Sequence, residues 1–145
     1  MMAQGKKGIE TLEVWRRSMD FAVRVCKEAL PLLPEEEKWA LNSQIRRAVQ
    51  SVPANIAEGY GRYSYQEGVR FGYIARGSLE EVYSQLTLAY ELGYLDKDKY
   101  DTLIAELKNV SRLLNGYLTY LKKRKLEIHE DDVDAEYLVA DFPDP

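Results

Sequence analysis

The feature that most constrains this chain is the spacing of its apolar residues, which recur at steps of three and four along four long segments. That period corresponds to one face of an α-helix, whereas a half-buried strand alternates at every second residue. Proline and glycine separate the segments, and these residues commonly end helices. The sequence therefore predicts four amphipathic helices and no strands.

The first predicted helix covers residues 11–30, with Thr11 as its N-cap. Pro31 and Pro34 are expected to end it, because proline cannot donate the next backbone hydrogen bond. Its apolar positions are Leu12, Trp15, Met19, Ala22, Val23, Cys26 and Leu30.

The second predicted helix begins at 35–37, where three glutamates favour the positive end of the helix dipole. We expect Pro53 to kink it, and Gly59 and Gly61 to end it. Its apolar positions are Trp39, Leu41, Ile45, Ala48, Val49, Val52 and Ile56.

The third and fourth predicted helices have clear starting signals. Ser64 and Glu67 form a capping box, in which each side chain satisfies a free backbone N–H. Gly93 is expected to end the third helix, and Asp96 or Asp98 to cap the fourth. The predicted core positions are Phe71, Ala75, Ser78, Leu79, Val82, Leu86 and Ala89, followed by Tyr100, Leu103, Ile104, Leu107, Ser111, Leu114, Leu118 and Leu121.

Short connections between long helices make antiparallel neighbours, so we expect an all-α, up-and-down four-helix bundle. The expected organisation is a flexible N-terminus over residues 1–9, the bundle over 10–124, and a short acidic C-terminal tail over 125–145. We expect the tail to be disordered, or docked as a short strand or turn.

Charge is distributed unevenly along the chain. Residues 125–145 hold eight carboxylates and one lysine, a net charge of −7. Because the whole chain carries −4, the preceding 124 residues carry +3. A mildly basic body therefore precedes an acidic tail, and one hypothesis is that the tail competes with polyanions for the body.

Several functional classes are poorly supported by the composition. Cys26 and His129 are single residues of their types, so a zinc site with several Cys or His ligands is excluded. Cys26 lies on an apolar stripe without an evident base, and His129 lies in the acidic tail. We expect no catalytic residues, no metal and no cofactor. No membrane span or signal peptide is apparent, which predicts a cytoplasmic protein.

Three segments carry a family resemblance. They are Leu12–Trp15, the run from Ser43 to Arg62 that contains Pro-Ala-Asn-Ile-Ala-Glu-Gly, and Phe71–Glu81. Together they resemble the 23S rRNA intervening-sequence protein family over about residues 10–121. The resemblance implies a four-helix bundle that assembles as a cyclic homopentamer, with a poorly defined function. A related branch, the accessory variability proteins of diversity-generating retroelements, implies nucleic acid and a reverse transcriptase as partners, but the acidic balance and tail of this chain differ from that branch.

The segment from Ser51 to Arg62 has two readings. In the structural reading, Pro53 kinks the helix while Asn55 and Glu58 pair with freed backbone groups or arginines, beside Gly59. In the functional reading, arginines converge on phosphate groups, which suit their forked donors, and tyrosines stack on bases. The candidate nucleic-acid-binding arginines are Arg46, Arg47, Arg62, Arg70 and Arg76, and the tyrosines are Tyr60, Tyr63 and Tyr65.

A second face of the predicted third helix is rich in tyrosine and lacks lysine. Tyrosine and arginine are enriched at protein interfaces, so this face predicts a subunit contact. The candidate interface residues are Val69, Tyr73, Tyr83 and Tyr90. The alternative is a wide core that buries the tyrosine rings and leaves their hydroxyls outside.

Two functional hypotheses follow. The first is a non-catalytic, oligomeric protein that binds RNA or DNA through arginines of the second and third helices. The second is a protein–protein scaffold or adaptor ring for a partner such as a reverse transcriptase, without direct contact with nucleic acid.

Overall fold

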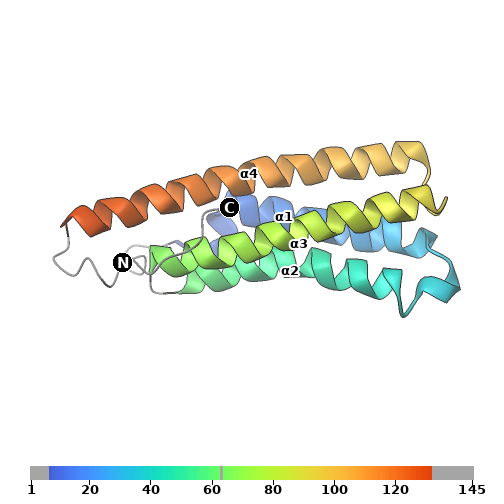
Figure 1. Ribbon diagram of the computed structural model, residues 1–145, viewed down its shortest axis with the longest axis horizontal. Helices are drawn as coiled ribbons and strands as arrows, with labels where there is room; N and C mark the ends of the chain where they lie inside the picture. Colours follow the sequence, from blue (N-terminus) through green and yellow to red (C-terminus); the bar gives the residue numbers. More distant parts are fainter. Residues whose placement is uncertain (1–6, 63, 132–145) are drawn as a thin grey trace.

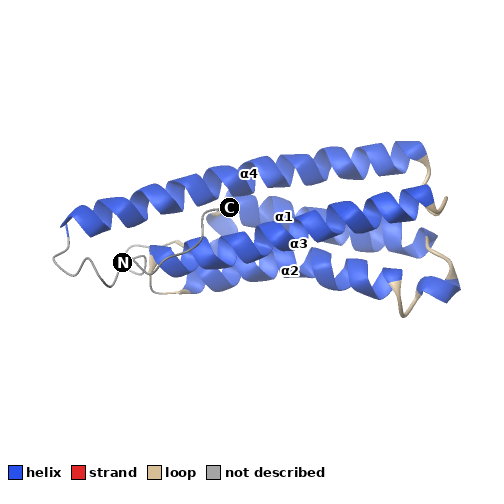
Figure 2. Ribbon diagram, viewed as in Figure 1, coloured by secondary structure: helices blue, strands red, loops and turns tan. Residues whose placement is uncertain are grey.

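The protein is a four-helix bundle in which consecutive helices run in opposite directions (Figure 1). The computed structural model describes residues 7–62 and 64–131. The helices α1 (Glu13–Arg24), α2 (Leu41–Gly61), α3 (Tyr65–Glu91) and α4 (Lys97–Asp131) form its frame. Each helix packs against the next, and α1 also packs against α4, which closes the bundle. The described residues contain helix and loop without any strand (Figure 2).

Short helical segments complete the chain. The 3₁₀ turn Ile9–Thr11 (η1) precedes α1. A π-helical turn, Val25–Ala29 (η2), and a 3₁₀ turn, Leu30–Leu32 (η3), follow α1 without a break. Glu35–Glu37 forms a separate 3₁₀ turn (η4).

The second predicted helix therefore begins later than the sequence suggests, at Leu41. Carboxylates favour the start of a short 3₁₀ turn as much as that of a long helix, so the three glutamates mark the start of η4 rather than that of α2. Trp39 lies ahead of α2 and is 85% exposed, so it is not a core residue.

The Ser64 half of the capping box and the Asp96 cap are confirmed. The Ser64 hydroxyl accepts a hydrogen bond from the Glu67 N–H at 3.3 Å, and Asp96 Oδ1 accepts one from the Lys99 N–H at 2.7 Å. Gly93 follows α3 with φ = 83°, the left-handed conformation that glycine adopts without strain. These signals depend on local hydrogen bonds, which explains why the sequence predicted them.

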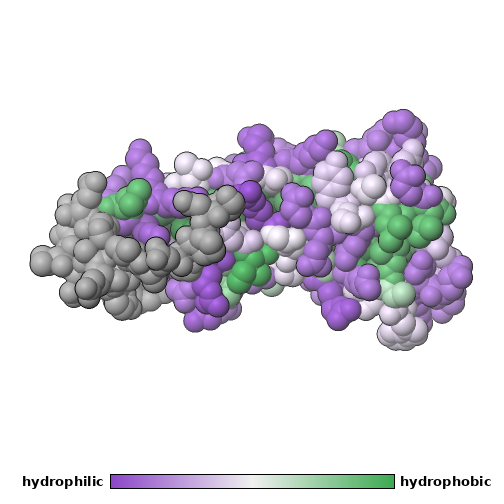
Figure 3. Space-filling view, in the orientation of Figure 1, coloured by the Kyte–Doolittle hydropathy of each residue, from purple (hydrophilic) through white to green (hydrophobic). Residues whose placement is uncertain are grey.

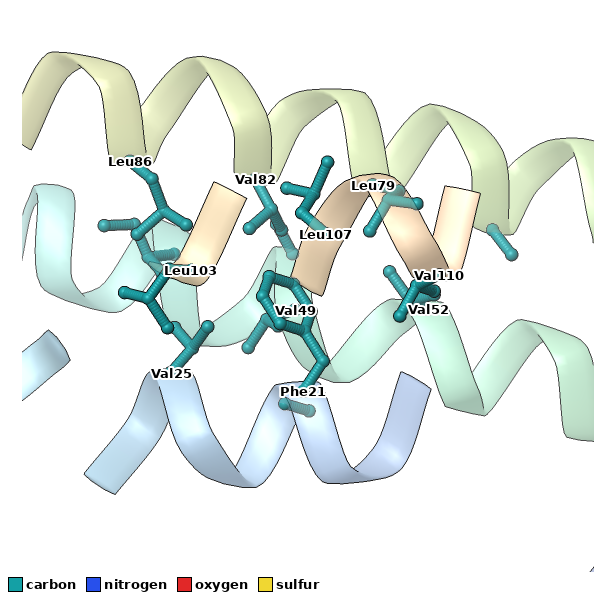
Figure 4. Packing of buried hydrophobic residues seen from close by; sticks show 14 of the residues in the cluster. Phe21, Val25, Val49, Val52, Leu79, Val82, Leu86, Leu103, Leu107 and Val110 are labelled. Carbon is teal, nitrogen blue, oxygen red and sulfur yellow. The ribbon is translucent and has the colours of Figure 1, made fainter. Parts of the chain in front are cut away.

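The core is a continuous apolar cluster to which all four helices contribute. Phe21, Val49, Val82 and Leu107 meet near its centre, each at most 1% exposed (Figure 4). Burying such side chains contributes about 1.5–3 kcal/mol each relative to leaving them exposed. The three- and four-residue periodicity of the sequence thus corresponds to one shared core.

The helix α4 runs to Asp131 and so includes the first residues of the predicted acidic tail. Glu127 lies in this extension and pairs with Arg124 at 2.9 Å. The expectations for residues 1–6 and for 132–145 lie outside the described residues. None of the helices in the described part combines the length and the apolar character needed to cross a membrane.

Candidate nucleic-acid interface

Two glycines bring three helices close together where α2 ends and α3 begins. A Cβ on Gly59 would lie 2.9 Å from the Cβ of Phe71 and 3.2 Å from the Cα of Gly68. A Cβ on Gly72 would lie 2.6 Å from Leu118 of α4. Gly59 does not end its helix, since α2 continues to Gly61. Its role is the close approach of α2 and α3.

This close approach corrects one predicted interface residue. Val69 is 1% exposed, so it belongs to the core rather than to an accessible face. It lies between Gly68 and Gly72, the glycines that admit α2 and α4 to this part of α3. Helical periodicity alone does not reveal such a local widening of the buried stripe.

Cationic side chains from three helices lie over aromatic rings beside this junction. The guanidinium carbons of Arg62 and Arg70 lie 5.1 Å and 5.3 Å from the centre of the Phe71 ring. Arg124 of α4 lies 5.6 Å from the centre of the Tyr65 ring. Cations at such distances are attracted by the negative face of an aromatic ring, which orients them without removing their charge.

The Tyr73 ring extends this arrangement along α3. Arg76 lies 6.0 Å from its centre, and Lys122 of α4 lies 5.1 Å from it. We call this region the basic end, defined by Arg62, Arg70, Arg76, Lys122 and Arg124. It lies where the α2–α3 turn and the C-terminal part of α4 meet (Figure 1).

Carboxylates of the same helices neutralise part of this charge. Glu58 pairs with Arg62 at 2.7 Å, and Glu67 pairs with Arg70 at 3.5 Å. With the pair of Arg124 and Glu127, three arginines of the basic end pair with carboxylates of the described residues. These pairs are largely exposed, and exposed pairs are worth only about 0–1 kcal/mol. A stronger anionic partner can therefore displace them.

Tyrosine side chains surround the cations. Burial raises the pKa of Tyr117, and the nearby hydroxyls of Tyr60, Tyr120 and Tyr65 raise it further. The pKa of Arg124 is raised by its hydrogen bond with Tyr65. Tyr120 is 53% exposed, so its ring offers a surface on which a base can stack. The prediction for Tyr63 lies outside the described residues.

The five predicted arginines do not converge on one site. Arg62, Arg70 and Arg76 lie at the basic end, whereas Arg46 lies about 24 Å from Arg62 along α2. Arg46 lines a hollow of about 410 Å³ together with Pro31 and Trp39. Arg47 lines another, of about 480 Å³, between α2 and α3. Arg124 and Lys122 complete the basic end and were missed, although the run Lys122–Lys125 marked them in the sequence.

The Pro53 segment makes contacts that belong to the fold. Pro53 is buried within α2, which continues across it. Asn55 donates to the backbone carbonyl and to the hydroxyl oxygen of Ser51, both at 2.8 Å. The Ser51 and Ser78 hydroxyls are 2.7 Å apart, which links α2 to α3. Ser51 and Asn55 thus lie at the contact between α2 and α3, Pro53 is buried within α2, and Glu58 reaches the basic end.

The predicted interface tyrosines lie along the seam between α3 and α4. Tyr90 stacks on Tyr100 with ring centres 4.5 Å apart. Lys108 lies 5.9 Å from the centre of the Tyr83 ring. Tyr73 packs against the core, and its hydroxyl is buried without a partner in the described part of the chain. A subunit contact through these tyrosines stays a prediction, since each already has neighbours within its own chain.

Other apolar side chains of α3, and Leu92 directly after it, are exposed, and sequence reasoning missed them. Ile74, Leu88 and Leu92 are 42%, 49% and 51% exposed. Figure 3 shows apolar surface gathered near the C-terminal end of α3. Their spacing matches one face of a helix, but the polar residues between them hid this pattern in the sequence.

The described residues contain no group of three or more His, Cys, Asp and Glu side chains that could hold a metal ion. Cys26 is half-buried and packs against the core. The side chain of His129 lies outside the described residues.

Comparisons with known proteins agree with this architecture. A family model described as 23S rRNA-intervening sequence protein matches residues 10–116. A crystal structure from Bacteroides thetaiotaomicron, described as a protein with unknown function from the S23 ribosomal protein family, is similar with a TM-score of 0.68 and 24% sequence identity. The match covers 74% of this chain and 96% of that chain, and at this identity it shows the fold alone. None of the curated proteins matches the chain. Neither description names a reaction.

Proposed function

Because the chain belongs to the 23S rRNA-intervening sequence protein family, we propose that it is a non-catalytic helical protein that binds RNA or DNA at its basic end. The observation that carries this proposal is the set of cations from α2, α3 and α4 held over aromatic rings. Guanidinium groups contact phosphates, and exposed aromatic rings stack on bases. Such a surface suits a nucleic acid with accessible bases.

Local charge supports the proposal better than net charge does. The chain carries −4 overall, yet five cations gather at the basic end, and among the described residues Glu58, Glu67 and Glu127 pair with three of them. At physiological ionic strength a charge is screened over about 8 Å. A bound phosphate therefore responds mainly to the cations around it, and distant carboxylates contribute little.

The proposal is tested by titrating the protein with a short labelled single-stranded RNA and with duplex DNA at 50 and 200 mM salt. If Arg62, Arg70 and Arg124 each contact a phosphate, these three contacts alone should make the association constant fall about 20- to 40-fold between the two salt concentrations. The variant R62Q/R70Q/R124Q should therefore bind at least tenfold more weakly at low salt, and its salt dependence should be shallower.

The matched control removes three exposed cations far from the basic end, in the variant K27Q/K38Q/K97Q. It has the same net charge as R62Q/R70Q/R124Q, so a difference between the two variants does not come from net charge. We expect the control to bind within about twofold of the unmodified protein. Equal losses in both variants would contradict a localised site, and absence of binding at 50 mM salt would refute nucleic-acid binding altogether.

A scaffold function is the second candidate, and the exposed apolar side chains of α3 favour it. Ile74 and Leu88 lie on α3, Leu92 follows directly after it, and the three side chains are 42–51% exposed. Their burial against another protein, or in a homo-oligomer such as a pentamer, would be favourable. Sedimentation at micromolar concentration tests this, because L88E/L92E should dissociate an assembly that buries them. A monomer in the unmodified protein would contradict the oligomer.

A further inference from the structure

A polar hollow lies between α2 and α3, away from the basic end. Its volume is about 480 Å³, and small-molecule sites commonly measure about 300–1,000 Å³. Its polar lining residues are Gln44, Arg47, Ser51, Ser78, Glu81 and Gln85. Arg47 lies about 22 Å from Arg62 along α2, so this hollow is separate from the basic end.

The antiparallel packing of α2 against α3 arranges these side chains in three levels (Figure 1). The hydroxyls of Ser51 and Ser78, 2.7 Å apart, form the first level. Arg47 and Glu81 form the second level, and the two glutamines form the third. Successive levels are three or four residues apart along each helix, which corresponds to about 4.5–6 Å. The hollow therefore presents hydroxyls, charges and amides in order.

The third level contains a buried acceptor without a donor. Gln85 Oε1 is shielded from solvent and accepts no hydrogen bond from the described residues. Leaving such an acceptor unsatisfied is costly, because its hydrogen bond with water is lost on folding and not replaced. The terminal torsion of a glutamine side chain is soft, so this amide can turn toward the hollow. A ligand that donates an N–H there would satisfy it.

The second level contains one cation and one anion. Within the described part of the chain, neither Arg47 nor Glu81 forms an ion pair, and both side chains are exposed. A guanidinium group binds a carboxylate through two parallel hydrogen bonds, and a carboxylate binds an ammonium group. Opposite charges that line the same hollow therefore suit a zwitterion better than a phosphate or a cation alone.

We propose that this hollow binds a free α-amino acid whose side chain carries an amide. The ligand carboxylate contacts Arg47, its ammonium group contacts Glu81, and its side-chain N–H donates to Gln85 Oε1. In glutamine, four bonds carry the amide nitrogen about 5 Å from Cα, which matches the spacing of about 4.5–6 Å between the second and third levels. Glutamate has the same shape but turns carboxylate oxygens toward Gln85 Oε1, so it is a poorer ligand. This inference is independent of nucleic-acid binding.

The test titrates the full-length protein with millimolar L-glutamine while amide chemical shifts are recorded. We expect saturable changes over residues 44–51 and 78–85, and at the side-chain amide of Gln85. L-glutamate should bind at least about fivefold more weakly, because it lacks the donor. Absence of saturable changes with L-glutamine, or equal binding of the two amino acids, would overturn the proposal.

The variants R47Q/E81Q and R46Q/E80Q form a matched pair. Each removes one positive and one negative charge from exposed positions on α2 and α3, so net charge is unchanged in both. Only Arg47 and Glu81 line the hollow. We expect R47Q/E81Q to bind L-glutamine at least about tenfold more weakly, and R46Q/E80Q to bind within twofold of the unmodified protein. Equal affinities of the two variants would overturn the roles of these charges.

Gln85→Met tests the buried acceptor separately, since methionine has a similar volume and no amide. We expect this variant to bind L-glutamine about three- to tenfold more weakly. Its stability in urea should not fall, because Oε1 has no hydrogen bond to lose within the described residues. A loss of stability would reveal a structural partner for Oε1, and unchanged affinity would remove its contact with the ligand; either result contradicts the proposal.

Discussion

At one end of the bundle α2 turns into α3 beside Arg62, Arg70 and Arg124, whereas at the other end α3 turns into α4 beside Asp96, Asp98 and Asp101. The second region also includes Glu35–Glu37, which approach it through a hydrogen bond of 3.0 Å from the Tyr94 hydroxyl to Glu37. We call it the acidic end; its lysines are Lys38, Lys97 and Lys99. Both ends are short connections between antiparallel helices, yet they have opposite charge.

The difference shows that the net charge of −4 describes neither end. A polyanion approaching the acidic end meets carboxylates, and one approaching the basic end meets guanidinium groups over aromatic rings. Lysines of the acidic end are paired as well, Lys97 with Asp101 and Lys99 with Glu28, so cations at both ends have carboxylate partners and the two ends differ in which charge is in excess. The location of cations, rather than their number, decides where phosphate can bind.

The largest expected effect on stability comes from Gly59→Ala, which would push α2 away from α3 at the basic end. The added Cβ would lie 2.9 Å from the Phe71 Cβ, an atom that cannot move without its backbone. We expect the free energy of unfolding to fall by about 1–3 kcal/mol. Urea denaturation measures this change. RNA affinity should fall as well, because the guanidinium groups of Arg62 and Arg70 pack over the Phe71 ring, which the added Cβ displaces.

Gly77→Ala is the matched control, since nothing lies within 4 Å of the added Cβ in the middle of α3. Alanine favours a helix interior over glycine by about 0.8–1 kcal/mol, so this variant should be more stable than the unmodified protein. Equal effects of the two substitutions would show that the helices are not closely packed at Gly59.

A smaller effect on stability is expected from removing the hydroxyl groups of two tyrosines, Tyr117 near the basic end and Tyr94 at the acidic end. The Tyr117 hydroxyl is buried without a partner in the described part of the chain, so Tyr117→Phe should raise the free energy of unfolding by about 1 kcal/mol. Tyr94→Phe should lower it, because the Tyr94 hydroxyl donates to Glu37. Thermal unfolding of both variants checks the opposite signs, and a loss of stability in Tyr117→Phe would reveal a partner for that hydroxyl.

The smallest effect concerns the pH dependence of Glu28, which pairs with Lys99 of the acidic end. Hydrogen bonding to Lys99 lowers the pKa of Glu28 below its usual 4.5, and the charges of Arg24 and Lys99 lower it further. A carboxyl whose pKa is lower in the folded state stabilises the fold above its unfolded pKa, and the stabilisation is lost as pH falls through the folded value. Denaturation between pH 6 and about 3 should therefore show a shallower decline in E28Q than in the unmodified protein. Parallel curves would contradict the pairing.

The sequence predicted the helices and most of the core because both depend on local period and capping. The hydroxyl of Ser64 and the carboxylate of Asp96 cap α3 and α4 as predicted. The start of α2 was wrong because Glu35–Glu37 favours a 3₁₀ turn as readily as a helix. The burial of Val69 depends on Gly59 and Gly72, whose effect appears only once helices pack.

The candidate site was predicted less completely. Arg62, Arg70 and Arg76 were identified by residue type, but their grouping depends on how α2 and α3 are rotated against each other. The sequence did not show that Arg46 and Arg47 lie away from the other three arginines. Their positions depend on which neighbouring helix each face of α2 packs against. Arg124 joins the site through antiparallel packing of α4, which brings residues distant in sequence side by side.

The most direct test of the basic end is a map of backbone amide chemical shifts during titration with a short single-stranded RNA. We expect chemical-shift changes over residues 58–76 and 117–127, and none over 31–46 or 90–101. Changes confined to the acidic end, or spread evenly over the bundle, would contradict it.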